Sequence, residues 1–249
     1  MGRHLSVPYS GHMKMFLDQF FSNDEGSIRI SRQQASTFAK RVAGDFNPIH
    51  NEDAKRFVVP GDLLFALILT RYGVSQKMHF NFEGMVGDAT PLHFPESEDE
   101  KLAICDENGK TYLTVERSGD NDQEQNLVRS LACSYVEFSG QTFPHILVPL
   151  MKQHNVMINT DRPLVIYESM SIDIDRLDIT DPKLELSGSS LEVEGKRGNV
   201  RLDFNLMSGD EVVGRGSKSM VLSGLREYDQ QKIDTLVSNF NAGKEAYAG

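Results

Sequence analysis

The sequence feature that most constrains the fold is the run "LLFALIL" at residues 63–69, in which every side chain is apolar. Pro60, Gly61 and Asp62 precede the run in a pattern typical of a helix start, and Gly73 stands near its end. A helix that is apolar on every side has no solvated face, so the rest of the chain must enclose it. The run is too short to span a membrane, which requires about 18 apolar residues or more.

The residues that follow this helix favour a sheet. Three strand-like runs come first, at residues 77–94, 101–116 and 126–140, with a turn at Asn108 and Gly109. A buried central helix followed by several long antiparallel strands predicts an α+β fold in which a sheet wraps around one helix.

The same order of elements then appears a second time, which predicts a diverged internal duplication. Residues 143–155 read as a helix with a proline near its start and a kinking Pro149. Four strand-like runs follow, at residues 163–177, 182–195, 199–209 and 211–224. We therefore expect a first half at residues 1–140, a second half at 141–225, and a C-terminal helix and tail at 226–249.

Composition excludes several classes of function. The net charge of -10, the pI near 5.2 and the lack of any basic run longer than two residues argue against binding to nucleic acid. The seven histidines make no metal-binding spacing, so neither a metal nor another cofactor is expected. Two lone cysteines and an amino terminus without an uninterrupted apolar stretch favour the cytoplasm, and no membrane span is expected.

The segment "AGDFNPIH" at residues 43–50 is the strongest candidate for a functional loop. A helix that starts after Ser31, with Gln34 completing a capping box, is expected to end at Gly44. Pro48 then favours extended geometry at Asn47, so the segment is predicted to be a loop. Residues 51–53 resemble the cap and first turn of a short second helix, with His50 just outside it.

The residue types in this loop allow two interpretations. Asp45 and His50 are able to share one water molecule and to act as acid and base. An aspartate near an Asn-Pro pair is also good turn chemistry, and a histidine before a helix is often only a structural residue. On the residues alone, a catalytic loop and a structural turn therefore both remain open.

Residues 43–50 resemble the signature of the MaoC-like, R-specific enoyl-CoA hydratases, a family with the hot-dog fold. Matches to the small-Gly-Asp-x-Asn-Pro-aliphatic-His pattern occur at Ala43, Gly44, Asp45, Asn47, Pro48, Ile49 and His50. The resemblance covers residues 20–140 loosely, and the second copy would complete a double hot dog with two antiparallel sheets, each around a long central helix. It implies hydration of trans-2-enoyl thioesters of coenzyme A or acyl carrier protein to R-3-hydroxyacyl thioesters, or the reverse dehydration.

The resemblance also assigns roles to single residues. Asp45 and His50 would hold the reacting water, Asn47 would orient it, and the N–H of Gly61 would bind the thioester oxygen. The family usually has a His-Gly-Met-like stretch where this chain has Pro60, Gly61 and Asp62. A carboxylate at that position could repel an acyl thioester, alter the base, or only cap the helix.

Two other functions remain open at this level. In a hot-dog thioesterase, Asp62 would activate water against the thioester carbonyl, whereas a non-catalytic acyl-thioester binding or regulatory module would keep the fold without turnover. Lys55, Arg56 and Arg71 are the basic residues nearest the loop that could hold a nucleotide, although surface charges of this kind are usually only solvated. The segment "GRGSKS" at residues 214–219 lacks phosphate-loop spacing and lies on a strand-like run. A double hot dog could be a monomer or a homodimer.

Overall fold

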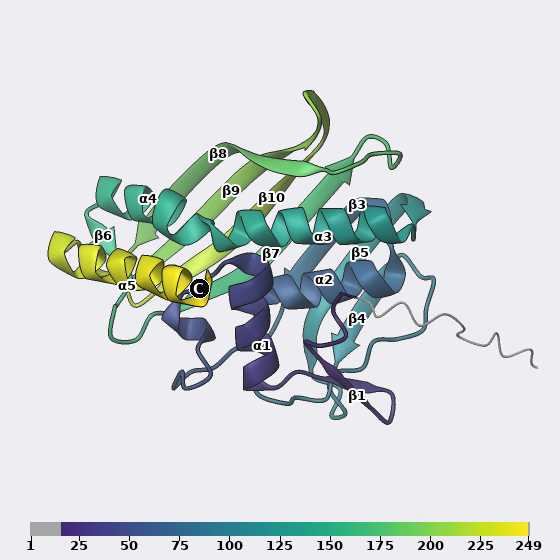
Figure 1. The fold of residues 1–249 in the computed structure, drawn as a ribbon, viewed down its shortest axis with the longest axis horizontal. Coiled ribbons are helices and arrows are strands. Elements are labelled where there is room, and N and C mark those ends of the chain that lie inside the picture. Colours follow the sequence, from purple (N-terminus) through teal and green to yellow (C-terminus); the bar gives the residue numbers. More distant parts are fainter. Residues whose placement is uncertain (1–15, 249) are drawn as a thin grey trace, which may run out of the picture.

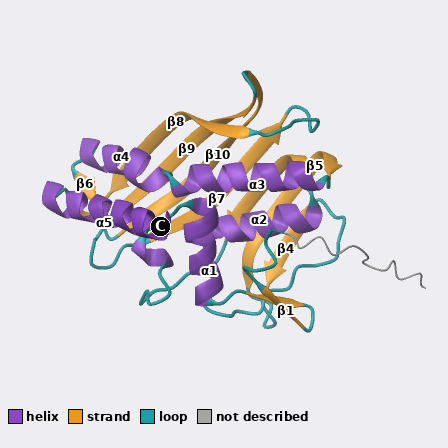
Figure 2. Ribbon diagram, viewed as in Figure 1, coloured by secondary structure: helices purple, strands orange, loops and turns teal. Residues whose placement is uncertain are grey.

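The computed structural model describes residues 16–248 as an α+β fold built on one seven-stranded antiparallel sheet (Figure 1). The helices lie on one face of the sheet, where α2 and α3 run side by side across the strands (Figure 2). In their order across the sheet, the strands are β4 (Lys101–Cys105), β5 (Thr111–Asp122), β3 (Val74–Phe82), β7 (Val165–Ile174), β10 (Glu211–Ser223), β9 (Arg197–Ser208) and β8 (Lys183–Glu194).

The predicted central helix is confirmed as α2 (Gly61–Tyr72). Residues 62–69 of this helix are all buried, as the lack of a solvated face requires. The ring of Phe65 packs edge-on against Phe80 of β3, with the ring centroids 5.2 Å apart. The helix therefore lies between the sheet and the elements that cover its other side.

Residues 126–140, predicted as a strand, form most of the helix α3 (Gln125–Gly140) instead. The carboxylate of Glu124 caps its N-terminus by accepting a hydrogen bond from the N–H of Leu127 at 2.9 Å. Apolar side chains recur every three or four residues along it, and the buried ones face α2 and the sheet. The strand prediction was wrong because the β-branched and aromatic residues of this segment suit both structures, and packing against α2 favours the helix.

The helical path continues from α3 through η3 (Phe143–Leu147) into α4 (Val148–Gln153), which confirms the predicted helix around Pro149. The tail forms α5 (Gln230–Ala248). Ile233, Leu236 and Phe240 of this helix are buried in a cluster with residues of α4 and of β8 to β10. The tail is thus part of a second apolar core beside the one that surrounds α2.

The strands of the two expected halves form a single sheet and not two separate ones. β3 of the first half pairs directly with β7 of the second, with Lys77 opposite Asp173 and Asn81 opposite Ser169. Pairing in this way satisfies the backbone groups of two strands that would otherwise be sheet edges. The consequence is a continuous sheet that carries helices from both halves on one face.

Short elements connect the amino-terminal part of the chain. They are β1 (Ser22–Asp24), β2 (Ser27–Arg29), α1 (Arg32–Phe38), the π-helical turn η1 (Ala39–Ala43) and the 3₁₀ turn η2 (Pro48–His50), with β6 (Val156–Met157) and β11 (Arg226–Glu227) farther on. Ser31 and Gln34 form the predicted capping box. Residues 1–15, which include most of the segment that argued against a secretory signal, lie outside the described part.

The predicted short helix after His50 is not present among the described residues. His50 is itself the last residue of η2, and the backbone of Asn51 is extended. The position of the turn has a local cause, since Pro48 is well suited to the first position of a helical turn and Asn47 supplies the cap. The helical turn therefore contains His50 instead of following it.

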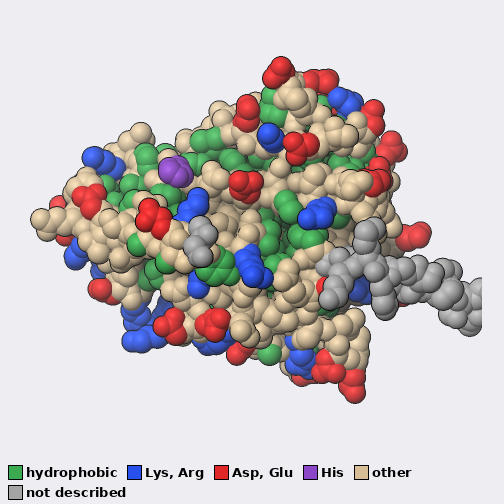
Figure 3. All heavy atoms as spheres, in the orientation of Figure 1, with side chains coloured by type: hydrophobic (Ala, Val, Ile, Leu, Met, Phe, Trp, Pro, Cys, Tyr) green, Lys and Arg blue, Asp and Glu red, His purple; other side chains and the backbone are tan. Residues whose placement is uncertain are grey.

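The face seen in Figure 3 carries Lys and Arg side chains among Asp and Glu side chains, with apolar atoms between them. Within residues 16–248, no helix combines the length and apolarity that crossing a bilayer requires.

Candidate functional site

The loop at residues 43–50 is shaped by one glycine and one asparagine. Gly44 ends η1 in the left-handed conformation, at φ 61° and ψ 24°, as the sequence predicted. Asn47 is extended at φ -61° and ψ 130°, and its side chain accepts a hydrogen bond from the N–H of Ile49 at 3.3 Å. The N–H of Asn47 donates to the carboxylate of Asp45 at 2.9 Å. These contacts give Asn47 a role in holding the loop.

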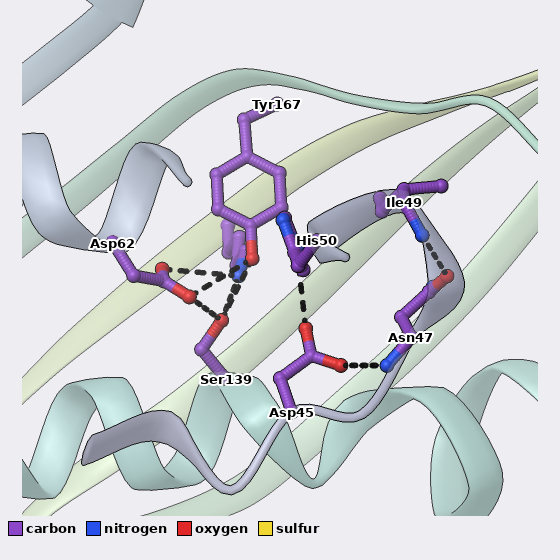
Figure 4. A network of polar contacts seen from close by, with 8 residues as sticks. Asp45, Asn47, Ile49, His50, Asp62, Ser139 and Tyr167 are labelled. Atoms are coloured by element: carbon purple, nitrogen blue, oxygen red, sulfur yellow. Dashed lines mark hydrogen bonds and ion pairs between the residues drawn. The ribbon is translucent and has the colours of Figure 1, made fainter. Parts of the chain in front are cut away.

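The side chains of Asp45 and His50 point toward each other (Figure 4). Nε2 of His50 lies 3.4 Å from Oδ2 of Asp45, and the two side chains are 13% and 16% exposed. Nδ1 of His50 is buried and has no hydrogen-bond partner within residues 16–248. The turn at Pro48 thus brings together an acid and a base that are five residues apart in sequence.

Close packing against α3 holds this loop in place. A Cβ atom added to Gly140 would lie 1.7 Å from the carbonyl oxygen of Ala43, so only glycine fits there. On the other side, the ring of Phe46 packs against Phe240 and Tyr247 of α5, at centroid distances of 6.1 and 5.7 Å. The loop is therefore fixed by α3 on one side and by the C-terminal helix on the other.

A cavity of about 280 Å³ opens beside the loop, and Asp45 and His50 form part of its wall. Its other lining residues are mostly apolar and come from both halves of the chain, among them Leu64, Phe82, Val86, Leu147, Ile166 and Met220. Such a cavity suits an apolar ligand group that meets a few polar side chains.

Gly61, at the first turn of α2, also lines this cavity. Pro60, at the N-cap position of the helix, makes no side-chain cap hydrogen bond. A Cβ atom at Gly61 would lie 2.6 Å from Cδ2 of Tyr167, so the glycine is needed there for the approach of the Tyr167 ring.

Asp62 is 4% exposed and lies behind the cavity wall, where it contacts two side chains that line the cavity. Its Oδ2 accepts hydrogen bonds from the hydroxyls of Ser139 at 2.6 Å and Tyr167 at 3.1 Å (Figure 4). Its Oδ1 lies 3.7 Å from Nζ of Lys218, a residue that is 1% exposed and also donates to the Ser139 hydroxyl. The acid therefore does more than cap the helix, because it pairs with a buried cation.

The network perturbs the acidity of its members. Burial lowers the pKa of Lys218 from its usual 10.5, and the carboxylates of Asp62 and Asp45 oppose this shift. Burial and the nearby Asp62 carboxylate raise the pKa of Tyr167 well above 10.0. The Tyr167 hydroxyl consequently keeps its proton throughout the neutral range.

Of the three basic candidates near the loop, only Arg56 lines the cavity, and it is exposed to solvent. Nη2 of Arg71 lies 3.9 Å from Oε1 of Glu96. Lys55 is exposed and does not line the cavity. No group of three His, Cys, Asp or Glu side chains suited to a metal ion occurs in the described part of the chain.

Comparison with known proteins supplies a family. Residues 15–231 match the family model described as "Protein of unknown function (DUF3581)". The chain belongs to the DUF3581 family. No curated protein matches the DUF3581 protein in sequence.

Solved structures similar to the DUF3581 protein include a MaoC-like dehydratase, with 8% identity, a TM-score of 0.42, and coverage of 81% of this chain and 97% of the other. An acyl-CoA thioesterase II from Mycobacterium marinum has 12% identity and a TM-score of 0.39, with coverage of 86% and 97%. A hot-dog-fold protein from Alicyclobacillus acidocaldarius has 8% identity and a TM-score of 0.44, with coverage of 83% and 97%.

Sequence reasoning about the DUF3581 protein missed Ser139, Tyr167 and Lys218. A signal for Lys218 was available in the sequence. Lys218, Met220 and Leu222 are spaced two residues apart on β10, so Lys218 faces the same side of the sheet as these buried apolar residues. Ser139 was hidden by the wrong strand prediction for its segment. Tyr167 carried no signal of its own, because its partners come from other elements.

Proposed function

We propose that the DUF3581 protein adds water to trans-2-enoyl thioesters, giving R-3-hydroxyacyl thioesters, or catalyses the reverse dehydration. The observation that carries this proposal is the convergence of Asp45 and His50, with 3.4 Å between Oδ2 and Nε2, on the wall of a largely apolar cavity. The same wall includes Gly61 at the start of a buried helix. A base, an acid and an anion-stabilising helix terminus thus surround one space.

In this proposal, Asp45 and His50 hold the attacking water between them. One of the two removes a proton as the water oxygen bonds to the β-carbon, and a proton from the pair is delivered to the α-carbon on the same face. Negative charge that develops on the thioester oxygen is stabilised by the N–H of Gly61 and the helix dipole. Positioned acid–base groups of this kind typically contribute about 100-fold to 10,000-fold in rate.

The cavity supports a short acyl group as the substrate class. Its volume of about 280 Å³ lies just below the range of small-molecule pockets, which is roughly 300 to 1,000 Å³. The apolar lining suits an acyl chain, whereas the carrier would extend outward past the exposed Arg56. We therefore expect crotonyl-CoA to react better than a long-chain enoyl-CoA, with coenzyme A or acyl carrier protein as the carrier.

We also propose that the fold is a double hot dog in which the two halves share one sheet. The first half would contribute α2 with β3, β4 and β5. The second would contribute the helical path from α3 to α4 with β7 to β10, which moves the proposed boundary from residue 140 to the start of α3 at Gln125. The contact between α2 and α3 and the pairing of β3 with β7 support this arrangement. On this view one chain already supplies both walls of the cavity.

Hydrolysis of the thioester is the competing reaction. In the thioesterase interpretation, Asp62 would activate water, yet its Oδ2 already accepts two hydrogen bonds and its Oδ1 faces Lys218. Asp62 also does not line the cavity. These contacts favour the Asp45–His50 pair as the reacting groups, and hence hydration.

The test follows enoyl-thioester absorbance after purified protein is added to crotonyl-CoA or trans-2-dodecenoyl-CoA, with free thiol monitored in parallel. Asp45→Asn and His50→Ala are expected to lose about 100-fold or more in rate. Asp53→Asn and His154→Ala, which alter an exposed carboxylate and an exposed imidazole, are the matched controls and should retain activity. Thiol release would indicate hydrolysis instead, and binding without turnover would indicate a binding module.

A further inference from the structure

Tyr167 is a polar residue of the cavity that the proposed acid–base pair does not use. It lies on β7, lines the cavity and packs its ring against Gly61, the residue expected to bind the thioester oxygen. Its hydroxyl reaches Oδ2 of Asp62 at 3.1 Å and the hydroxyl of Ser139 at 2.8 Å. The ring edge of Tyr167 therefore lies beside Gly61, and its hydroxyl lies against Asp62 and Ser139.

The hydrogen bonds in the network show which contact is easiest to exchange. Ser139 donates to Asp62 at 2.6 Å, and Lys218 donates to the Ser139 oxygen. The bond from Tyr167 to Asp62 is longer, at 3.1 Å, and shares the same carboxylate oxygen. If the Tyr167 proton turned toward a ligand, Asp62 would still have its bond from Ser139 and its ion pair with Lys218.

We propose that Tyr167 is a catalytic residue whose hydroxyl donates a hydrogen bond to the thioester carbonyl oxygen of the substrate, beside the N–H of Gly61. This inference rests on the proposed function and assigns a second donor to the same site. The ligand chemistry that it requires is a carbonyl oxygen next to the acyl chain, on which negative charge accumulates during the reaction.

Lys218 and Ser139 act as positioning residues in this scheme. Nζ of Lys218 lies 3.7 Å from the centroid of the Tyr167 ring, which holds the ring face by a cation–π contact. Nζ of Lys218 also lies 3.7 Å from Oδ1 of Asp62, the residue that follows Gly61 at the start of α2. The raised pKa of Tyr167 ensures that a proton is available for donation at neutral pH.

The experiment compares a ligand that carries the carbonyl oxygen with one that lacks it. One is a ketone analogue of butyryl-CoA in which methylene replaces the thioester sulfur, and the other is S-butyl-CoA, which lacks the carbonyl oxygen. Calorimetry gives the affinity of each for the wild type, Tyr167→Phe and the control Tyr72→Phe, whose hydroxyl bonds to Pro95 away from the cavity. Crotonyl-CoA turnover is measured on the same proteins.

Tyr167→Phe is expected to bind the ketone about tenfold more weakly while its affinity for the thioether stays unchanged, and to lose about 100-fold in kcat. Tyr72→Phe should change neither the ratio of the two affinities nor kcat. If Tyr167→Phe leaves the ratio of the ketone and thioether affinities unchanged, the role of Tyr167 is overturned. If the wild type hydrates crotonyl-CoA while this ratio stays unchanged, the proposed function stands and only the inference fails. If the wild type binds neither ligand and is inactive, both fail.

A second variant tests the positioning role. Lys218→Met is expected to reduce the preference for the ketone over the thioether, because the tyrosine ring loses its cationic neighbour. A purely structural role for Lys218 would lower both affinities equally and leave their ratio unchanged. Should this variant fail to fold, the Tyr167→Phe comparison still decides the assignment of the donor.

Discussion

Nζ of Lys218 on β10 lies 3.7 Å from Oδ1 of Asp62 at the start of α2, and both side chains are almost fully buried. This ion pair joins a strand of the second half to the central helix of the first, directly behind the cavity wall. Removing two charges from water is costly, and strong attraction and additional hydrogen bonds must offset that cost. The hydroxyls of Ser139 and Tyr167 provide those hydrogen bonds.

We expect Lys218→Met to lower the free energy of unfolding by about 3–5 kcal/mol, because it leaves the Asp62 carboxylate buried without its cation. Urea denaturation followed by circular dichroism measures the change. The double variant Asp62→Leu, Lys218→Met should lose much less than the sum of the two single variants, since no uncompensated charge remains. Additive losses would show that the two residues do not act as a pair.

Much of the fold could be predicted from local patterns. The apolar run at residues 63–69 indicated a buried helix, and glycine at position 44 indicated where a helix ends, because both features depend on residues that are close in sequence. Polar and apolar residues alternate along the strand-like runs of the second half, and the four predicted strands are confirmed as β7 to β10. The motif at residues 43–50 likewise predicted a loop that brings Asp45 and His50 together.

The remaining features depend on contacts between distant elements. Ser139, Tyr167, Lys218 and Asp62 come from four different elements, and no local pattern relates them. The segment of α3 was predicted as a strand because its β-branched and aromatic residues suit both structures, and only its packing against α2 decides between them. The pairing of β3 with β7 likewise arises from the meeting of two halves.

Gly140→Ala is expected to disturb the candidate loop. The new Cβ atom would lie 1.7 Å from the carbonyl oxygen of Ala43, which is backbone and cannot rotate away. Overpacking of this kind costs about 1–3 kcal/mol or more and should displace Asp45, so crotonyl-CoA hydration should fall with it. Gly188→Ala on β8 is the matched control, since its Cβ would contact only the Asp203 side chain, at an ordinary distance of 3.5 Å. Equal stability and activity in both variants would contradict the close approach.

Tyr135→Phe is expected to stabilise the protein by about 1 kcal/mol at neutral pH. The Tyr135 hydroxyl is buried without a hydrogen-bond partner in the described part, and such a group carries a desolvation cost that phenylalanine avoids. Thermal or urea denaturation measures the change. Tyr72→Phe should have the opposite effect, because it removes a hydrogen bond of 2.7 Å to the carbonyl oxygen of Pro95.

Tyr135→Phe should also change how the free energy of unfolding depends on pH in the alkaline range. Burial raises the pKa of Tyr135 well above 10.0, so above that pH the unfolded chain loses a proton that the folded chain retains. Stability therefore falls as the pH rises past 10.0, by up to about 1.4 kcal/mol per pH unit for each such tyrosine. Tyr135→Phe removes one of these contributions, so its curve should be flatter than that of the wild type. Parallel curves would contradict the raised pKa.

The contact between the loop and α5 gives a final prediction. Phe46 stands between Asp45 and Asn47 and packs against Phe240 and Tyr247, so we expect Phe46→Ala to loosen the loop. Stability should fall by about 1–3 kcal/mol, because this side chain is only partly buried. A shift of about 1 Å in the acid–base pair can cost roughly 100-fold in rate, so kcat for crotonyl-CoA should fall more than the stability change alone explains.

Phe46→Leu keeps an apolar side chain against α5 and is therefore the matched control, expected to retain most of the activity. Both variants are assayed well below their unfolding temperatures, so that only folded protein contributes to kcat. A Phe46→Ala protein with wild-type kcat would show that the loop keeps its geometry without α5. In that case the packing of Gly140 against Ala43 would be sufficient to hold Asp45 beside His50.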